Sequence, residues 1–504
     1  MGDTPVVIIG GGATGTGILR DCALRGIDAV LVEMHDLATG TSGRFHGLLH
    51  SGARYAVKDF HSAVECITEN TLLKKLAPWC VEDTGGLFIA TSDDDPAYAA
   101  TWLEGCRKAG IAAREVSPAE VKKEVPLISG KISRAFAVPD ATVDGFTLAA
   151  ANARDAEKRG SMVKTYARVT GFGISGKRIT SVMIRDAGGR EEELACSLVV
   201  NAAGPWAGQV ASMAGEELAL SPDRGIMVVF HYRFTPKVLN RLHPPGDGDI
   251  FVPHHDVTIF GTTSKTVKDP DDLTVEQDEV LAMLALGKAL IPSIEDLRTI
   301  RAFAGVRPLF EEKEGQEGRE ATREFSLIDH GARGGPENLV SVVGGKLTTY
   351  RLMAQKAVDL IAARTGVTKP CSTATEPLSP PSAVEEPGIA GLLCECEQVK
   401  GSTVLEASGA RSLHSLSDIR RLTRMGMGPC QGTFCAFRAA GYLAGEKNLG
   451  AGEAQRLIAE DLAERWKGVK PVLWGWQARQ SELARRIYMN LFSLERQEGL
   501  KNEL

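Results

Sequence analysis

The sequence predicts an α/β fold for most of the chain, followed by a small helix-rich unit. Three observations lead to this prediction. A short β-branched run near the N-terminus ends in a glycine-rich turn, a helical pattern follows directly, and two close pairs of cysteines occur late in the chain. At 504 residues the chain is too long for one hydrophobic core, so several structural units are expected. The 54 glycines indicate many tight turns and close backbone approaches.

Composition and charge exclude some classes of protein. The formal net charge of -6 and the pI of 6.0 argue against a general nucleic-acid binder. No apolar run is long enough to cross a bilayer, and the N-terminus lacks the basic region of a signal peptide. We therefore expect a cytoplasmic protein with no nucleic-acid partner.

The N-terminal segment predicts one βαβ unit, with a strand over residues 5–9, a helix to residue 25 and a second strand over residues 29–32. Gly10 permits the tight turn, Gly12 lets the backbone approach a pyrophosphate, and Gly15 lets helix and strand pack closely. Glu33 follows the second strand, where a carboxylate accepts hydrogen bonds from an adenosine ribose. The unit therefore predicts a Rossmann-type dinucleotide site, and a nucleotide-free turn of the same shape is the alternative.

A polar, glycine-rich loop follows the ribose-binding position and runs through HGLLHSGARYAV at residues 46–57. This segment resembles the signature of FAD-dependent glycerol-3-phosphate dehydrogenases, and it is closer to the anaerobic, multi-subunit type than to the aerobic one. The segments NAAGPW (201–206), GVRPL (305–309), TRE (322–324) and GGKLTTY (344–350) follow in the order that family shows. The resemblance covers about the first 370 residues.

The resemblance implies a Rossmann-type FAD-binding domain interleaved with a substrate domain, as in the D-amino-acid-oxidase-like fold, over residues 1–371. The FAD-binding parts are expected at about 1–90, 140–210 and 330–371, and the substrate parts at about 91–139 and 211–329. FAD is the implied cofactor. The residues expected to contact it are Gly10, Gly12, Ala13, Thr14, Gly15, Glu33, Thr41, Ser42, Arg44, Gly47, Leu48, Leu49, Val169, Ala203, Gly204, Trp206, Gly345, Lys346, Leu347 and Thr348.

The implied reaction is oxidation of sn-glycerol 3-phosphate to dihydroxyacetone phosphate, with hydride transfer to the flavin. By the resemblance, Arg54 and Arg323 are the candidates for the substrate phosphate, with Tyr55 in support, because the planar guanidinium makes paired, charge-assisted hydrogen bonds. Arg307 and Lys346 are expected nearer the reacting carbon, where they bind substrate and stabilise developing alkoxide charge. Surface or interdomain ion pairs are the alternative interpretation of these cations.

The proton acceptor is less clearly indicated. His50 is the candidate base, because imidazole is the side chain that titrates near neutral pH without perturbation. A histidine that only hydrogen-bonds FAD or its own loop is an equal alternative. His254 and His255 are further candidates without positional support.

Two tight cysteine pairs predict a metal centre in the C-terminal unit. Cys394 and Cys396 form a C-x-C pair, and Cys430 and Cys435 form a C-x4-C pair. Four thiolates suit iron–sulfur or zinc, but zinc knuckles more often use C-x2-C. The spacing resembles the [2Fe–2S] domain of the bacterioferritin-associated-ferredoxin type, with a helix capped at Ser417 or Asp418. We therefore predict a [2Fe–2S] cluster, with zinc as the less favoured occupant.

The remaining C-terminal sequence predicts a linker and a helical tail. Residues 372–388 are rich in proline, serine and threonine, as in linkers. We place the iron–sulfur domain at 389–445 and a helical tail at 446–504, where Leu483, Ile487 and Leu491 share one helix face. The tail is expected either to pack on its own domain or to dock a partner.

The family resemblance implies partner subunits that relay electrons to membrane quinone, and hence peripheral association at the inner face of the cell membrane. Two other functions remain open from the sequence. One is a 2-hydroxy-acid or amine dehydrogenase on the same fold, and the other is a non-catalytic electron-transfer subunit.

Overall fold

A six-stranded, mostly parallel sheet carries the glycine-rich turn. The structure, a computed structural model, describes residues 4–310, 324–380, 391–410, 414–492 and 494. Strand order across the sheet is β20-β21-β13-β1-β2-β9, and only the β20–β21 pair is antiparallel. The strands are β1 (Val6–Ile9), β2 (Ala29–Val32), β9 (Met162–Lys164), β13 (Leu198–Asn201), β20 (Phe325–Asp329) and β21 (Leu339–Gly344).

Both faces of this sheet are buried, as expected for parallel strands. In β1, Val6 and Ile8 pack with a core that includes Ile18, and Val7 and Ile9 pack with a core on the opposite face. The helices of the first face are α1 (Ala13–Arg25), α5 (Gly145–Glu157) and α8 (Tyr350–Thr365). The second face is covered by a three-stranded sheet of β10 (Ala167–Ser175), β11 (Arg178–Asp186) and β12 (Glu191–Ala195), with α6 (Ala207–Ser212) nearby. The predicted βαβ unit is confirmed at the expected residues.

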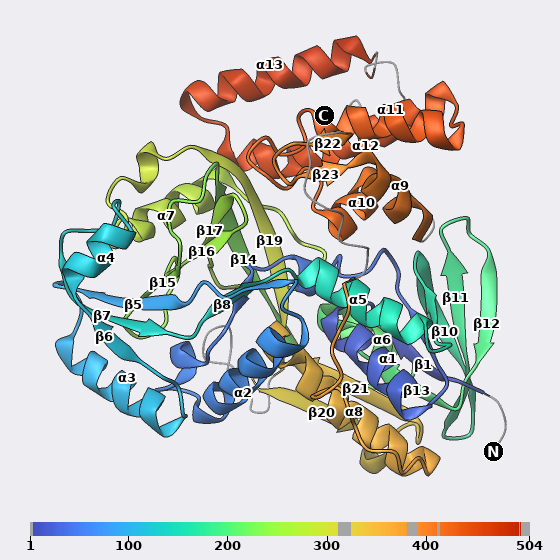
Figure 1. The fold of residues 1–504 in the computed structure, drawn as a ribbon. Coiled ribbons are helices and arrows are strands. Elements are labelled where there is room, and N and C mark those ends of the chain that lie inside the picture. Colours follow the sequence, from blue (N-terminus) through green and yellow to red (C-terminus); the bar gives the residue numbers. More distant parts are fainter. Residues whose placement is uncertain (1–3, 311–323, 381–390, 411–413, 493, 495–504) are drawn as a thin grey trace.

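A second, larger sheet forms the other half of the oxidoreductase part, on the side away from β10–β12 (Figure 1). Three phenylalanines on it, Phe230, Phe251 and Phe260, are fully buried in one core with residues of α4 and α7. The strands are β5 (Gly86–Thr91), β6 (Arg114–Val116), β7 (Ile132–Val138), β14 (Leu220–Phe230), β15 (Val238–Arg241), β16 (Ile250–His254), β17 (Val257–Gly261), β18 (Lys265–Thr266) and β19 (Thr299–Phe310). The helices are α2 (Phe60–Leu76), α3 (Pro96–Lys108), α4 (Pro118–Glu124) and α7 (Gln277–Gly287).

The two sheets interleave along the chain, so the predicted fold class is confirmed for this part. Two strands lie on the other side of the predicted boundaries. β5 starts at residue 86 and joins the larger sheet, and β20, at 325–329, joins the parallel sheet. A small sheet of β3 (Leu48–Leu49), β8 (Ala141–Val143) and β4 (Val81–Glu82) lies between these parts of the sequence.

The C-terminal unit is mainly helical and lies above both sheets in Figure 1. Its elements are β22 (Leu392–Cys394), β23 (Val399–Lys400), α9 (Gly401–Ala410), α10 (Leu416–Thr423), α11 (Cys435–Lys447), α12 (Ala451–Val469) and α13 (Gly475–Leu491). Ser415, not Ser417 or Asp418, is the N-cap of α10, and Asp418 completes its capping box. Leu457 of α12 shares a core with Val404 and Leu443, so part of the predicted tail belongs to the cysteine-bearing unit.

The first part of the predicted linker packs against the oxidoreductase part. Leu378 is buried, its N–H donates to the Leu76 carbonyl, and its carbonyl accepts from Trp79 Nε1. Residues 381–388 of that prediction lie outside the described residues. Among the described helices, none is both long and apolar enough to span a membrane.

Strand β19 crosses directly over the loop that follows the ribose position. A Cβ at Gly305 would lie 1.9 Å from the Arg44 carbonyl oxygen, and Thr41 Oγ1 donates to the Val306 carbonyl. Gly305 therefore provides the space that brings β19 and this loop together.

We predict that Gly305→Ala lowers the free energy of unfolding by about 1–3 kcal/mol, because the added methyl group has backbone on its far side and must displace a strand. Chemical denaturation of the purified variant measures this change. Gly130→Ala is the matched control, since nothing lies within 4 Å of a Cβ there. Equal stability of both variants would contradict the close contact.

Candidate functional site

The turn after β1 has no room for side chains. Gly10 has a φ of 112°, and a Cβ there would lie 2.5 Å from the Ala202 carbonyl oxygen. A Cβ at Gly15 would lie 1.9 Å from the Gly10 carbonyl oxygen, so α1 starts in direct contact with the strand. Gly12 is the N-cap of α1 and contributes no side-chain cap. The positive end of the α1 dipole therefore faces the space beyond the turn, which suits a pyrophosphate.

Glu33 is held by backbone amides at the end of β2. Its carboxylate accepts from the Gly11 N–H at 2.6 Å and from the His35 N–H at 2.9 Å. Burial raises the pKa of Glu33, and these amide donors oppose that rise. The fixed carboxylate lines the cavity at the position expected for an adenosine ribose.

A cavity of about 830 Å³ extends from this turn to the larger sheet. Its size lies within the range for cofactor-binding clefts. Most of the residues expected to contact FAD are in its wall, whereas Gly15, Gly47 and Leu49 are not. The predicted residues in the wall are Gly10, Gly12, Ala13, Thr14, Glu33, Thr41, Ser42, Arg44, Leu48, Val169, Ala203, Gly204, Trp206, Gly345, Lys346, Leu347 and Thr348.

The fit to FAD depends on backbone groups more than on side chains. The Ala13 N–H donates to Ser42 Oγ at 2.9 Å, which ties the following loop to the start of α1. Gly344 and Gly345 have φ values of 77° and 75°, so the turn before Lys346 presents its backbone to the cavity. Such turns orient N–H groups toward an anionic ring system. The residues present therefore fit an extended dinucleotide with a flavin.

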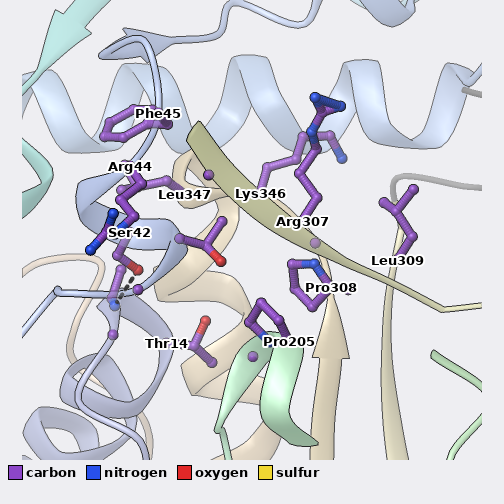
Figure 2. Close-up of a pocket in the computed structure, with 18 of the residues that line it drawn as sticks. Thr14, Ser42, Arg44, Phe45, Pro205, Arg307, Pro308, Leu309, Lys346 and Leu347 are labelled. Carbon is purple, nitrogen blue, oxygen red and sulfur yellow. Dashed lines mark hydrogen bonds between the residues drawn. The ribbon is translucent and has the colours of Figure 1, made fainter. Parts of the chain in front are cut away.

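Cationic side chains gather at the other end of the cavity. In Figure 2 the side chains of Arg307, on β19, and Lys346, after β21, project toward one part of the cavity, away from Thr14 and Ser42. Arg54 and Tyr55 line the same cavity. The Lys346 ammonium lies 4.9 Å from the centre of the Tyr55 ring. The structure thus places every described substrate candidate in one cavity; Arg323 lies outside the described residues.

Two buried aspartates hold the arginines in place. Arg54 Nη2 lies 2.9 Å from Asp249 Oδ2, and Arg307 Nη1 lies 2.7 Å from Asp223 Oδ2. Burial alone would raise the pKa of Asp249, but hydrogen bonding to His243 and the charge of Arg54 lower it to about 2. Asp223 and Asp249 were not identified from the sequence, because no local motif marks them. Ion pairing and a place in the cavity, which the sequence left as alternatives for these cations, occur together.

Histidines line the cavity beside these cations. The rings of His46, His50 and Tyr55 follow one another, with centroids 5.9 Å and 5.3 Å apart. Burial, with the charges of His46, Arg54 and Lys346, holds the pKa of His50 well below its usual range. Burial and nearby arginines likewise lower the pKa of His46 to about 3. Both imidazoles are therefore neutral near pH 7, and a neutral imidazole can accept a proton. His46 was not singled out from the sequence.

His254 and His255 do not line this cavity. His254 Nε2 instead lies 3.1 Å from Arg424 Nη1, at the boundary with the C-terminal unit. His255 Nδ1 lies 3.6 Å from Glu397. The structure thus gives no support to either histidine as the proton acceptor.

The four late cysteines meet in two pairs. All ten cysteines are free thiols. Cys394 is hydrogen-bonded to Cys435, and Cys396 to Cys430. Gly428 fits tightly beside them, because a Cβ there would lie 2.4 Å from the Cys396 Cβ. In the part of the chain that the structure describes, no three His, Cys, Asp or Glu side chains surround one metal ion. The thiols are thus adjacent as predicted, but the predicted cluster is not itself established.

Comparison with known proteins agrees with the fold and the cavity. Residues 5–351 match the family described as FAD dependent oxidoreductase. The A subunit of the anaerobic glycerol-3-phosphate dehydrogenase of Escherichia coli (strain K12) is 40% identical over 98% of this chain and 97% of its own length. The corresponding Haemophilus influenzae protein is 38% identical over 97% of this chain and 93% of its own.

A solved structure, the glycerol-3-phosphate dehydrogenase from Bacillus halodurans complexed with FAD, has a similar fold. Its TM-score is 0.60 at 22% identity, over 98% of this chain and 94% of that one. The match of the family over residues 5–351 and the identity to the A subunits over nearly the whole chain lead to one conclusion. This chain belongs to the FAD-dependent oxidoreductases and, within them, to the family of anaerobic glycerol-3-phosphate dehydrogenase A subunits.

Proposed function

We propose that this chain is the catalytic subunit that oxidises sn-glycerol 3-phosphate to dihydroxyacetone phosphate and passes the electrons through a [2Fe–2S] cluster to partner subunits and membrane quinone. The observation that carries this proposal is the meeting of Arg54, Arg307, Lys346 and a neutral His50 in one cavity with the dinucleotide turn. The relatives named as glycerol-3-phosphate dehydrogenases support the choice of substrate.

FAD, when bound in this cavity, supplies the acceptor for the hydride from C2 of the substrate. The chain's own residues bind and orient the alcohol. Arg54 and the described cations beside it offer charge-assisted hydrogen bonds to a phosphate, and Asp249 keeps the guanidinium from moving. Arg307 and Lys346 stabilise negative charge on the substrate oxygen as its proton leaves. His50 accepts that proton at its imidazole, which its low pKa keeps unprotonated.

The electron-transfer part of the proposal rests on how the thiols pair. In a [2Fe–2S] cluster four cysteines share two irons, so two pairs of thiols are needed. One tetrahedral zinc needs all four thiolates around a single point. The pairs Cys394–Cys435 and Cys396–Cys430 favour the iron–sulfur cluster. A flavin that takes up two electrons can then release them singly.

Helix α13 offers a surface for a partner protein. Trp476, Leu483, Ile487 and Leu491 expose 78%, 62%, 50% and 68% of their surface along its outer side. Exposed apolar stripes of this kind mark interfaces. The relatives are named as one of several subunits, which supports an assembly with other chains. We therefore place the chain at the inner face of the membrane through its partners, with no membrane insertion of its own.

A substrate panel tests the reaction. We expect sn-glycerol 3-phosphate to be oxidised with an artificial acceptor far faster than glycerol, a 2-hydroxy acid or an amino acid. Arg54→Ala should lose roughly 1.5–3 kcal/mol of transition-state binding, or about 10- to 150-fold in kcat/KM, as for a charged hydrogen bond. Arg134→Ala is the control, because Arg134 pairs with Glu115 at the surface. Faster oxidation of a 2-hydroxy acid or amine would favour that alternative, and no turnover would favour a non-catalytic subunit.

The protonation state of His50 predicts a flat pH dependence. Its folded-state pKa is lowered, so the neutral form persists as the pH falls below 6.5. We expect the rate of flavin reduction at saturating substrate to stay constant from about pH 8 to pH 6. Saturation removes the effect of substrate phosphate titration on binding. A rate that falls through about pH 6.5 would show that His50 is not the proton acceptor in this state.

Metal analysis tests the cysteine site. Anaerobically purified protein should hold roughly two iron atoms and matching sulfide per chain. Cys396→Ser should lose this iron, whereas Cys371→Ser should retain it, because Cys371 lies beside Thr373, away from the four paired thiols. Zinc in place of iron, or iron retained in Cys396→Ser, would contradict the assignment.

A further inference from the structure

Arg424 is a buried cation at the boundary between the cysteine-bearing unit and the oxidoreductase part. It follows α10 directly, with a φ of 65°, and only 8% of its surface is exposed. A buried guanidinium is costly unless its donors are satisfied. Here three side chains from three separate segments surround it, namely Glu397, Asp144 and His254.

On one side, Arg424 reaches the cysteine loop. Its Nε donates to Glu397 Oε2 at 3.0 Å, and Glu397 directly follows Cys396. The backbone N–H groups of Glu397 and Gly426 donate to the Cys394 sulfur. Gly426 is two residues after Arg424 in the chain. Arg424 thus fixes both segments that provide these amide donors.

On the other side, Arg424 reaches elements that support the cavity loop. Its Nη1 donates to Asp144 Oδ2 at 2.6 Å, and Asp144 caps α5. The next residue, Gly145, lies against the loop, because a Cβ there would be 2.3 Å from the Ser42 carbonyl oxygen. His254 Nε2, 3.1 Å from Arg424, belongs to a ring that packs on Gly47.

We propose that Arg424 is a positioning residue for electron transfer: it fixes the amide donors of the Cys394 sulfur against the elements that support the flavin loop, and so raises the reduction potential of the centre held by the cysteines. The inference rests on the proposed function, which supplies that centre. Amide hydrogen bonds to ligand sulfurs stabilise the more negative, reduced form of a cluster, so their loss lowers its potential. Asp144 and Glu397, left without their cation, add to that effect.

The planar fork matters as well as the charge. A guanidinium can donate to Glu397 and Asp144 at once from fixed directions, whereas a lysine ammonium is a single point charge. Arg424→Lys therefore keeps the charge but loses the geometry. The matched control is Arg421→Gln, because Arg421 lies on the same helix and pairs across the same boundary with Asp36 at 2.9 Å, away from the cysteine loop.

The test is a spectroscopic redox titration of the full-length protein with its cofactors. We expect Arg424→Gln and Arg424→Lys to shift the one-electron equilibrium of the cluster at least tenfold toward the oxidised form, a fall of about 59 mV. Flavin reduction by sn-glycerol 3-phosphate should keep its wild-type rate. Arg421→Gln should leave the potential unchanged. A wild-type potential in Arg424→Lys, or an equal fall in Arg421→Gln, would overturn the proposal.

Hydrogen exchange separates this inference from the proposed function and from a failure to fold. We expect faster exchange at residues 394–397 and 426 in Arg424→Lys, but not in Arg421→Gln, with the rest of the chain unchanged. This readout holds whether the centre is iron–sulfur or zinc. Absence of iron with this exchange pattern would reject the cluster but keep the positioning role, whereas unchanged exchange would reject the positioning role itself.

Discussion

The structure depends on the lack of space at the turn after β1. A Cβ at Gly15 would collide with the Gly10 carbonyl oxygen, so α1 can begin only where these glycines stand. That placement directs the α1 N-terminus toward the cavity, and Ser42 then ties the next loop to Ala13. Strand β19 crosses the same loop at Gly305 and brings Arg307 into the cavity. Cofactor end and substrate end are thus joined through one loop, with no long-range flexibility required.

Much of this could be predicted from the sequence, because the signals are local. The βαβ unit is confirmed at its expected residues, since the glycine spacing and Glu33 lie within one short segment. The cysteine pairs are likewise recognisable by their spacing alone. The family, the fold class and FAD follow from several motifs that agree with one another, and the comparisons confirm the first two.

What the sequence could not provide comes from sheet register and domain contact. Asp223 meets Arg307 because β14 pairs with β19 across 84 positions, and Asp249 meets Arg54 across 195. Arg424 contacts Asp144 over 280 positions. β5 and β20 lie on the other side of the expected boundaries because each pairs with a strand distant in sequence. Ser415 caps α10 one turn before Asp418 because its hydroxyl and that carboxylate form a reciprocal capping box.

The central claim is that the cationic end of this cavity presents sn-glycerol 3-phosphate to a bound flavin. The most direct measurement is an anaerobic visible spectrum of the purified, FAD-loaded protein before and after adding sn-glycerol 3-phosphate. The account predicts that the flavin bands bleach, above a broad absorption from thiolate-bound iron. A flavin that stays fully oxidised at full FAD content would contradict the assigned substrate.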